Sequence, residues 1–240
     1  MTEIVAVEAE PHDLPLSEPF HIALGTRNEA NNVLVTIETE NGTRGYGEGS
    51  PSLPVTGETR AAALETARAA AELLEGEPVD EYRRLTDLVR DTFPGMVSAT
   101  FAVETALLDA YCRERGIAFA ELFGGPPESV RTDLTVPLMP PAEAGDRAAT
   151  AAARGFDQLK LGTDVETDIE RVAAVRDEVP EAELKSDANQ GWTPKETVRF
   201  ANRIADADID LELIEQPVPA SNVAGLAEAT RRVDVPIAAD

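Results

Sequence analysis

Cysteine, histidine and long apolar runs are scarce in this 240-residue sequence. The single cysteine, Cys112, excludes an internal disulfide, and its segment has helical apolar spacing, which predicts a buried, unreactive thiol. His12 and His21 are the only histidines and both lie near the N-terminus, which argues against a histidine-rich zinc site and against a Ser-His-Asp triad. No apolar run approaches the roughly 20 residues of a membrane span, and the N-terminus lacks a signal-peptide pattern, so we expect a soluble cytoplasmic protein.

Basic residues are also few. The 21 Lys and Arg residues stand against 45 Asp and Glu residues, a formal charge of -24 that argues against nucleic acid or an anionic membrane as partner. Such a self-repelling surface is suited to high salt, so we predict a halophilic protein. Only Lys160, Lys185 and Lys195 are lysines. Each matters, because the pKa of a lysine, unlike that of an arginine, can fall far enough for it to act as a base.

Two kinds of pattern divide the chain. Residues 1–125 begin with strand-like alternation on both sides of an Asn-Gly turn at 41–42, and helical apolar spacing follows over 59–75, 80–92 and 97–115. These features predict an α+β capping domain that ends at the Gly-Pro turn "LFGGPP".

Residues 126–240 alternate short strands with helices. We predict strands at 131–138, 156–162, 182–189, 210–217 and 235–240, with helices at 142–154, 167–178, 194–206 and 223–232. An open dinucleotide-binding sheet would carry a Gly-rich turn after its first strand, and "TVPLMPPAEAG" has none. The prediction is therefore an α/β (β/α)8 TIM-type barrel of which only about the first five strands are present.

Three consecutive predicted strands end on an acidic residue: Asp187, Glu215 and Asp240. The carboxyl ends of such strands meet at one face, so these side chains are expected to converge, and a hard divalent cation would relieve their repulsion. Mg²⁺ fits carboxylate ligands with remaining positions for water or substrate. Each acid alone could instead cap a helix, and Asn189 is better explained as a nearby hydrogen-bonding group than as a ligand.

Lys160 lies near the end of the preceding predicted strand, on the same face as Gln158. Beside a bound cation its pKa would fall, which favours a catalytic base, while the alternative is an ion pair with the carboxylates. Lys185 is expected in a structural ion pair. A lysine base next to carboxylate-bound Mg²⁺ suits removal of the proton α to a carboxylate, with a stabilised enediolate intermediate.

The segments "FAVETALLDAYCRERGIAFAELFGG", "DANQGW", "IEQPV" and "PIAAD" together resemble the enolase superfamily, in its mandelate racemase/muconate lactonizing enzyme family. The N-terminal loops are most similar to the dipeptide epimerases. The resemblance implies Asp187, Glu215 and Asp240 as Mg²⁺ ligands, and a small carboxylate or dipeptide substrate of the L-Ala-D/L-Glu type. Substrate-binding positions are then assigned to Thr26, Thr135, Gln158 and Asn189. The activities of o-succinylbenzoate synthase, cycloisomerase and sugar-acid dehydratase remain alternatives.

The sequence departs from that family in two places. The family carries Lys-x-Lys on the second barrel strand. Here Lys160 matches the first lysine, with Gly162 in place of the second, or it matches the second, with Gln158 in place of the first. The sequence also stops at Asp240, before the strand that bears the opposite lysine, so we expect a truncated chain with at most one of the two bases. A non-catalytic paralogue or a cation-binding module is the alternative, and open strand edges predict a homo-oligomer.

Overall fold

The computed structural model describes residues 2–22, 25–125, 129–164 and 168–240. The chain divides into two compact units. Unit 1 comprises Met1–Ser17 and Asn28–Glu128, and unit 2 comprises Glu18–Arg27 and Ser129–Asp240. The predicted boundary after residue 125 adjoins residues that lie outside the described ones. The sequence analysis expected residues 1–125 to form one continuous domain, whereas Glu18–Arg27 group with unit 2.

A three-stranded sheet of order β1-β2-β3 is formed by β1 (Ile4–Ile22), β2 (Gly25–Thr39) and β3 (Arg44–Gly49), and all of it except the part within Glu18–Arg27 belongs to unit 1. Strands β2 and β3 are antiparallel. Their turn is closed by the N–H of Gly42, which donates to the Thr39 carbonyl at 2.8 Å, and Gly42 has a positive φ of 78°. The Asn-Gly hairpin expected from the sequence is therefore confirmed.

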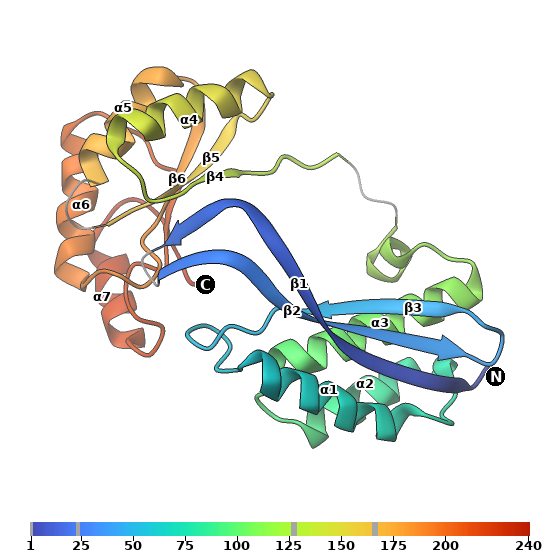
Figure 1. The fold of residues 1–240 in the computed structure, drawn as a ribbon. Helices are drawn as coiled ribbons and strands as arrows, with labels where there is room; N and C mark the ends of the chain where they lie inside the picture. Colours follow the sequence, from blue (N-terminus) through green and yellow to red (C-terminus); the bar gives the residue numbers. More distant parts are fainter. Residues whose placement is uncertain (1, 23–24, 126–128, 165–167) are drawn as a thin grey trace. The chain divides into compact units, whose positions relative to one another are not determined.

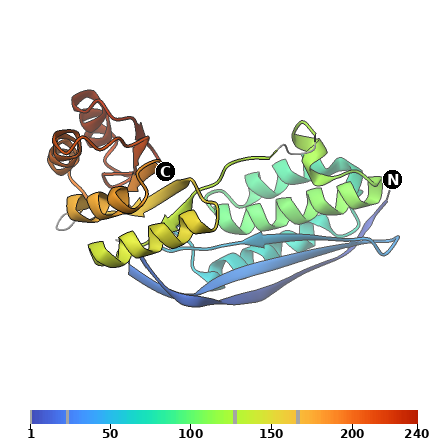
Figure 2. The ribbon, with the colours of Figure 1, turned by 90° about the horizontal axis from the view of Figure 1, so that it is seen from above.

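Three helices pack on one face of this sheet, as Figure 2 shows. They are α1 (Arg60–Leu74), α2 (Tyr82–Thr92) and α3 (Val97–Arg115), close to the predicted ranges, with short 3-10 helices at Val79–Glu81 and Phe119–Phe123. Their apolar faces bury alanine and leucine against alternate residues of β2. Cys112 is buried within α3, as predicted.

Strand β3 and helix α3 approach unusually closely. Glycines alternate along β3 on its buried face. A Cβ atom added to Gly45, Gly47 or Gly49 would lie 2.0 to 2.4 Å from the nearest backbone atom of α3. Only glycine allows this distance between strand and helix, so the motif "GYGEG" serves packing.

Unit 2 contains a parallel sheet with the sequential order β4-β5-β6-β7-β8 (Figure 1). The strands are β4 (Leu134–Val136), β5 (Gln158–Gly162), β6 (Glu183–Asp187), β7 (Leu213–Glu215) and β8 (Ile237–Ala238). A doubly wound sheet would change direction in its strand order, and this one does not. The order is consistent with part of a (β/α) barrel.

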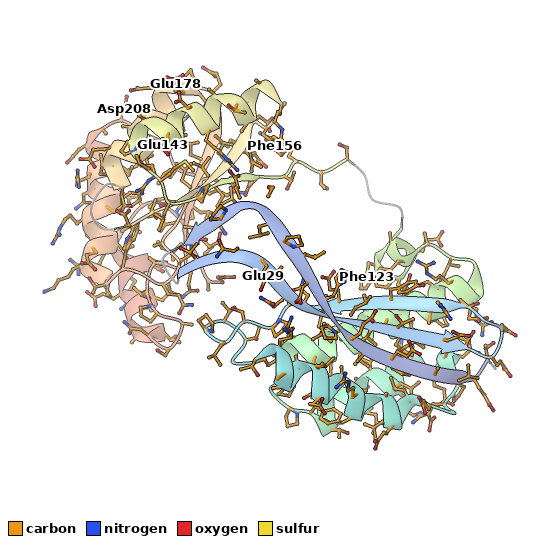
Figure 3. The ribbon with its side chains drawn as sticks, viewed as in Figure 1. Glu29, Phe123, Glu143, Phe156, Glu178 and Asp208 are labelled. Carbon is orange, nitrogen blue, oxygen red and sulfur yellow. The ribbon has the colours of Figure 1, made fainter. Side chains whose placement is uncertain are left out.

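The helices of unit 2 alternate with the strands: α4 (Pro141–Ala153), α5 (Asp168–Glu178), α6 (Pro194–Asp206) and α7 (Val223–Arg232). The first residue of the predicted helix 167–178 lies outside the described residues. Helices α4 and α5 pack together and carry Glu143 and Glu178, labelled in Figure 3. Among the described helices, none combines the length and apolarity needed to cross a membrane.

Local sequence explains where α6 and α7 begin. The Thr193 hydroxyl accepts from the N–H of Glu196, and the Glu196 carboxylate accepts from the N–H of Thr193, which forms a capping box followed by Pro194 at the first helical position. Asn222 caps α7 by accepting from the N–H of Gly225. Both helices have the bounds that the sequence predicted.

Candidate active site

Polar residues lie in two layers on one face of the parallel sheet. In the first layer, the strand register pairs Thr135 with Lys160 and Lys160 with Lys185. In the second layer, two residues further along β5 and β6, it pairs Gly162 with Asp187 and Asp187 with Glu215. Register partners in a parallel sheet share a face. The intervening residues are buried on the opposite face, against the helices: Leu159, Leu161, Leu184 and Ile214. The second layer stands at the carboxyl ends of the strands, where βα proteins bind their ligands.

Lys160 connects the two carboxylates of that layer. Its Nζ lies 2.9 Å from Asp187 Oδ2 and 2.7 Å from Glu215 Oε1. The Asp187 side chain is only 8 % exposed, and those of Glu215 and Lys160 are 21 % and 26 % exposed. Acidic side chains from two neighbouring strands therefore converge on a single positive charge, and Asp187 is the most buried of the three groups.

The same contacts decide the charge of Lys160. Burial by itself lowers the pKa of its ammonium group, but the hydrogen bonds to Glu215 and Asp187 and the charges of both carboxylates outweigh burial and raise that pKa. The lowered pKa predicted from the sequence applies to Lys160 beside a bound cation, and it stays a prediction. The alternative, an ion pair with the carboxylates, is the arrangement that the structure contains.

Strained backbone follows each of the two carboxylates. Among the described residues other than glycine, four have a positive φ, and three of them are Asn189 at 47°, Gln190 at 67° and Gln216 at 32°. The N–H of Asn189 donates to Asp187 Oδ1 at 2.8 Å, and the N–H of Gln190 donates to the Gln216 carbonyl at 2.7 Å. Strained conformations of this kind cluster at functional sites because the surroundings must hold them. The backbone of Asn189 thus lies beside the Asp187 carboxylate, and the role of its side chain stays a prediction.

Gln216 is a residue of this region that sequence reasoning missed. Its side chain is buried, donates to the Val218 carbonyl at 2.8 Å and accepts from the N–H of Asp240 at 2.7 Å. It therefore ties the end of β7 to the backbone that follows β8. The available signal was its position directly after Glu215 in "IEQP", where a polar residue precedes a proline.

Asp240 lies beyond the strand register that aligns the other two carboxylates. Glu215 pairs with Ala238, so Asp240 lies two residues further along the chain, and it is exposed. Among the described residues, no group of three or more His, Cys, Asp or Glu side chains is arranged to hold a metal ion. The place of Asp240 beside Asp187 and Glu215 therefore stays a prediction.

The remaining predicted residues are dispersed. Thr135 is half-buried and pairs in register with Lys160. Gln158 lies at the start of β5, where its amide donates to Glu183 at 2.6 Å, so it is two residues before Lys160 and away from the carboxyl ends. Thr26 is an exposed residue of β2. Lys185 forms the structural ion pair expected from sequence, 2.9 Å from Asp133.

The donor chemistry of Asp187 and Glu215 fits a hard divalent cation. Both offer carboxylate oxygens, and both contact the same cationic group. Mg²⁺ is commonly held by one or two carboxylates, with water or substrate oxygens completing its shell. These two residues therefore supply the carboxylate ligands that such a site requires from the protein.

Comparison with known proteins agrees with this geometry. Residues 3–124 match the mandelate racemase/muconate lactonizing enzyme N-terminal domain, and residues 143–240 match the enolase C-terminal domain-like family. The chain belongs to the mandelate racemase/muconate lactonizing enzyme family. The resemblance read from the sequence motifs is confirmed, and the enolase-like neighbours support a capping domain followed by part of a barrel.

Relatives within this family are dipeptide epimerases. The chain is 35 % identical to the L-Ala-D/L-Glu epimerase of Bacillus subtilis and 36 % identical to the hydrophobic dipeptide epimerase of Enterococcus faecalis, in each case over 99 % of its own length. It covers 66 % and 68 % of those relatives, so it spans about two thirds of their length.

Solved structures of the same relatives have the same fold. A substrate-liganded complex of the B. subtilis epimerase gives a TM-score of 0.94 at 34 % identity, with 99 % of this chain and 68 % of that chain covered. The E. faecalis dipeptide epimerase, complexed with Mg and the dipeptide L-Leu-L-Tyr, gives 0.93 at 34 % identity, with the same two coverages.

Proposed function

We propose that this protein uses Mg²⁺ to remove the proton α to a carboxylate, and that its substrate is a dipeptide that it epimerises. The observation that carries the proposal is the convergence of Asp187 and Glu215 on one cationic group at the carboxyl ends of neighbouring strands. The dipeptide epimerases among its relatives support the substrate class.

Each side chain then has a role. Asp187 and Glu215 would hold Mg²⁺, with Asp240 as a third ligand. When bound, the metal stabilises the negative charge that develops on the substrate carboxylate as the α-proton leaves. Lys160 Nζ is assigned as the group that carries the proton, because it lies on the same face of the sheet as the two proposed ligands and next to them. The N–H of Asn189 fixes the Asp187 carboxylate in position.

Substrate contacts are assigned to Thr135, Thr26, Gln158 and Asn189. Of these, Thr135 has the strongest support, because it is the register partner of Lys160 and is half-buried on the same face. Gln158 has the weakest, since its amide is engaged with Glu183 at the start of β5. Thr135→Val removes the hydroxyl at constant volume and should raise KM more than it lowers kcat.

Exchange of the α-proton with deuterated solvent tests the proposal. Exchange requires one proton-carrying group, whereas net epimerisation requires two on opposite faces of the α-carbon. L-Ala-L-Glu and L-Leu-L-Tyr are the test substrates, followed by mass spectrometry with and without Mg²⁺. Exchange should depend on Mg²⁺ and be lost in Asp187→Asn and Glu215→Gln.

The matched control is Glu181→Gln, an exposed carboxylate shortly before β6. It should exchange at the wild-type rate. Metal binding that survives Asp187→Asn combined with Glu215→Gln would contradict the assigned ligands. Mg²⁺ binding at this site without exchange of any dipeptide would favour a non-catalytic member of the family.

One observation favours a second substrate class. The structure of the N-succinyl Arg/Lys racemase from Bacillus cereus also matches this chain, with a TM-score of 0.93 at 26 % identity over 99 % of this chain and 66 % of that one. N-succinyl-L-arginine therefore belongs in the same exchange assay. Faster exchange of this compound than of either dipeptide would replace the dipeptide assignment.

A further inference from the structure

Lys160 occupies the position between two carboxylates where a cation is needed. We propose that its ammonium group is an internal counter-ion that competes with Mg²⁺ for Asp187 and Glu215, so that metal binding releases Lys160 from both. The inference rests on the proposed function, because it takes these two residues as metal ligands. It adds a coupling between metal occupancy and the freedom of Lys160.

The contacts show why lysine and metal exclude each other. Asp187 Oδ1 accepts from the N–H of Asn189 at 2.8 Å, and Asp187 Oδ2 faces Lys160 Nζ at 2.9 Å. Glu215 Oε1 faces the same nitrogen at 2.7 Å. An Mg²⁺ ion held by these two oxygens would place further positive charge next to the ammonium group, and the repulsion between the two cations would favour displacement of Lys160.

Charge leads to the same conclusion. Two carboxylates and one ammonium carry a net charge of about -1 within a poorly hydrated group, and removing the ammonium would make it about -2. A divalent cation is attracted more strongly to the second arrangement and is repelled by an ammonium that stays in place. Lys160 therefore stabilises the two acids without metal and weakens their affinity for it.

The neighbouring lysine provides an internal comparison. Lys185 is the register partner of Lys160 on β6, and it lies on the same face of the sheet. Its Nζ is 2.9 Å from Asp133 and 3.5 Å from Glu212. Lys185 has its own pair of acids, one layer before the carboxyl ends, so its removal should disturb the sheet without freeing Asp187 or Glu215.

The coupling has a consequence for the proposed reaction. A lysine that donates to two carboxylates has its hydrogen-bonding capacity directed at them and not at a substrate. Once the metal takes over those carboxylates, Nζ becomes available on the same face. Lys160 would then approach the α-carbon only when the metal is present, which avoids unproductive proton transfer in its absence.

Isothermal titration calorimetry with Mg²⁺ tests the competition. Lys160→Met should bind Mg²⁺ about tenfold or more tightly than wild type, because the repulsion and the two competing contacts are gone. Lys160→Arg, which keeps the charge, should stay close to wild type, and Lys185→Met should change the affinity much less than Lys160→Met. Equal or weaker binding by Lys160→Met overturns the inference.

Wild-type protein offers a second measurement that does not depend on a folded variant. The chain has three lysines, so lysine labelled with ¹³C at Cε gives three side-chain NMR signals. Titration with Mg²⁺ should shift the Lys160 signal in proportion to metal binding and leave that of Lys195 unchanged. A Lys160 signal that stays constant while metal binds also overturns the inference.

The two proposals fail in different ways. If Asp187→Asn and Glu215→Gln abolish Mg²⁺ binding while Lys160→Met binds Mg²⁺ like wild type, the metal site is supported and the counter-ion role of Lys160 is refuted. If the double carboxylate variant still binds Mg²⁺ with wild-type affinity, the assignment of Asp187 and Glu215 as metal ligands is refuted.

Discussion

The Glu58 carboxylate accepts a 2.6 Å hydrogen bond from the backbone N–H of Ser98, in the first turn of α3. It also accepts from the N–H of Ala99 at 3.1 Å, and Glu58 is 2 % exposed. The N-cap of α3, Met96, supplies no side-chain hydrogen bond, so this distant glutamate caps the helix in its place.

Replacing this carboxylate should destabilise unit 1. Glu58→Ala leaves two N–H groups buried without acceptors, and we expect a loss of about 3 kcal/mol in the free energy of unfolding, measured by urea denaturation. Glu58→Gln keeps one acceptor and should lose less. Glu65→Ala, at an exposed position of α1 where Glu65 pairs with Arg68, should cost under about 1 kcal/mol. Similar losses for Glu58→Ala and Glu65→Ala would contradict the capping role.

The close approach of β3 and α3 predicts a second stability effect. A Cβ atom on Gly47 would lie 2.0 Å from the carbonyl oxygen of Ala102, a backbone atom that cannot move without shifting the helix. Gly47→Ala should therefore destabilise the fold by about 3 kcal/mol or prevent folding.

Arg44→Ala, on the exposed face of the same strand, is the control for Gly47→Ala. It loses one exposed ion pair and should change the free energy of unfolding by less than about 1 kcal/mol. A Gly47→Ala protein with wild-type stability in urea would show that β3 and α3 can separate at little cost.

These two examples show what the sequence reveals and what it conceals. Helices α6 and α7 were predicted with their observed bounds, because apolar spacing and caps such as Thr193 are local signals. Contacts between distant residues left no such signal. Glu58 and Ser98 are 40 residues apart, and nothing near either one indicates the other.

The candidate site shows the same division. The strand ends at Asp187 and Glu215 were readable, since each carboxylate closes a short strand pattern that is followed by a helix pattern. Whether Lys160 faces a cation or two anions depends on side chains from three strands at once. The position of Asp240 depends on the register of β8 against β7, which pairs Glu215 with Ala238. Pattern alone does not fix that register.

Net charge predicts how salt affects stability. A chain with a formal charge of -24 repels itself when folded, and added salt screens this repulsion, with a Debye length that falls from about 30 Å at 0.01 M to about 3 Å at 1 M. We expect the Tm to rise steadily over that range of NaCl, measured by circular dichroism. A glucose series of equal osmolality should raise it less. A Tm that is constant or falls with NaCl would contradict the predicted adaptation to high salt.

Asp168, at the start of α5, predicts a dependence of stability on pH. Its side chain is 6 % exposed and accepts from the backbone N–H of Asp164, and Arg171 Nη1 lies 3.5 Å away. Burial, the largest influence, raises the pKa of Asp168 from 3.8 to about 7, and the hydrogen bond from Asp164 and the charge of Arg171 only partly oppose it.

The sign of the effect follows from proton binding. Between about pH 4 and pH 7 the unfolded chain has lost the Asp168 proton while the folded protein retains it, so this group makes stability fall as pH rises through that window. Each unit of pKa difference is worth about 1.4 kcal/mol. In Asp168→Asn the side chain stays neutral at every pH, so this contribution is absent.

Urea unfolding at intervals from pH 4 to pH 8 measures the difference. The free energy of unfolding of wild type relative to Asp168→Asn should decrease by several kcal/mol between pH 4 and pH 7 and then level off, whatever constant offset the lost contact with Arg171 adds. Asp177→Asn changes the global charge equally, at an exposed position of the same helix, and should follow the wild-type profile. A difference between wild type and Asp168→Asn that does not vary with pH would mean that Asp168 is already ionised in the folded protein at pH 4, held in that state by Arg171.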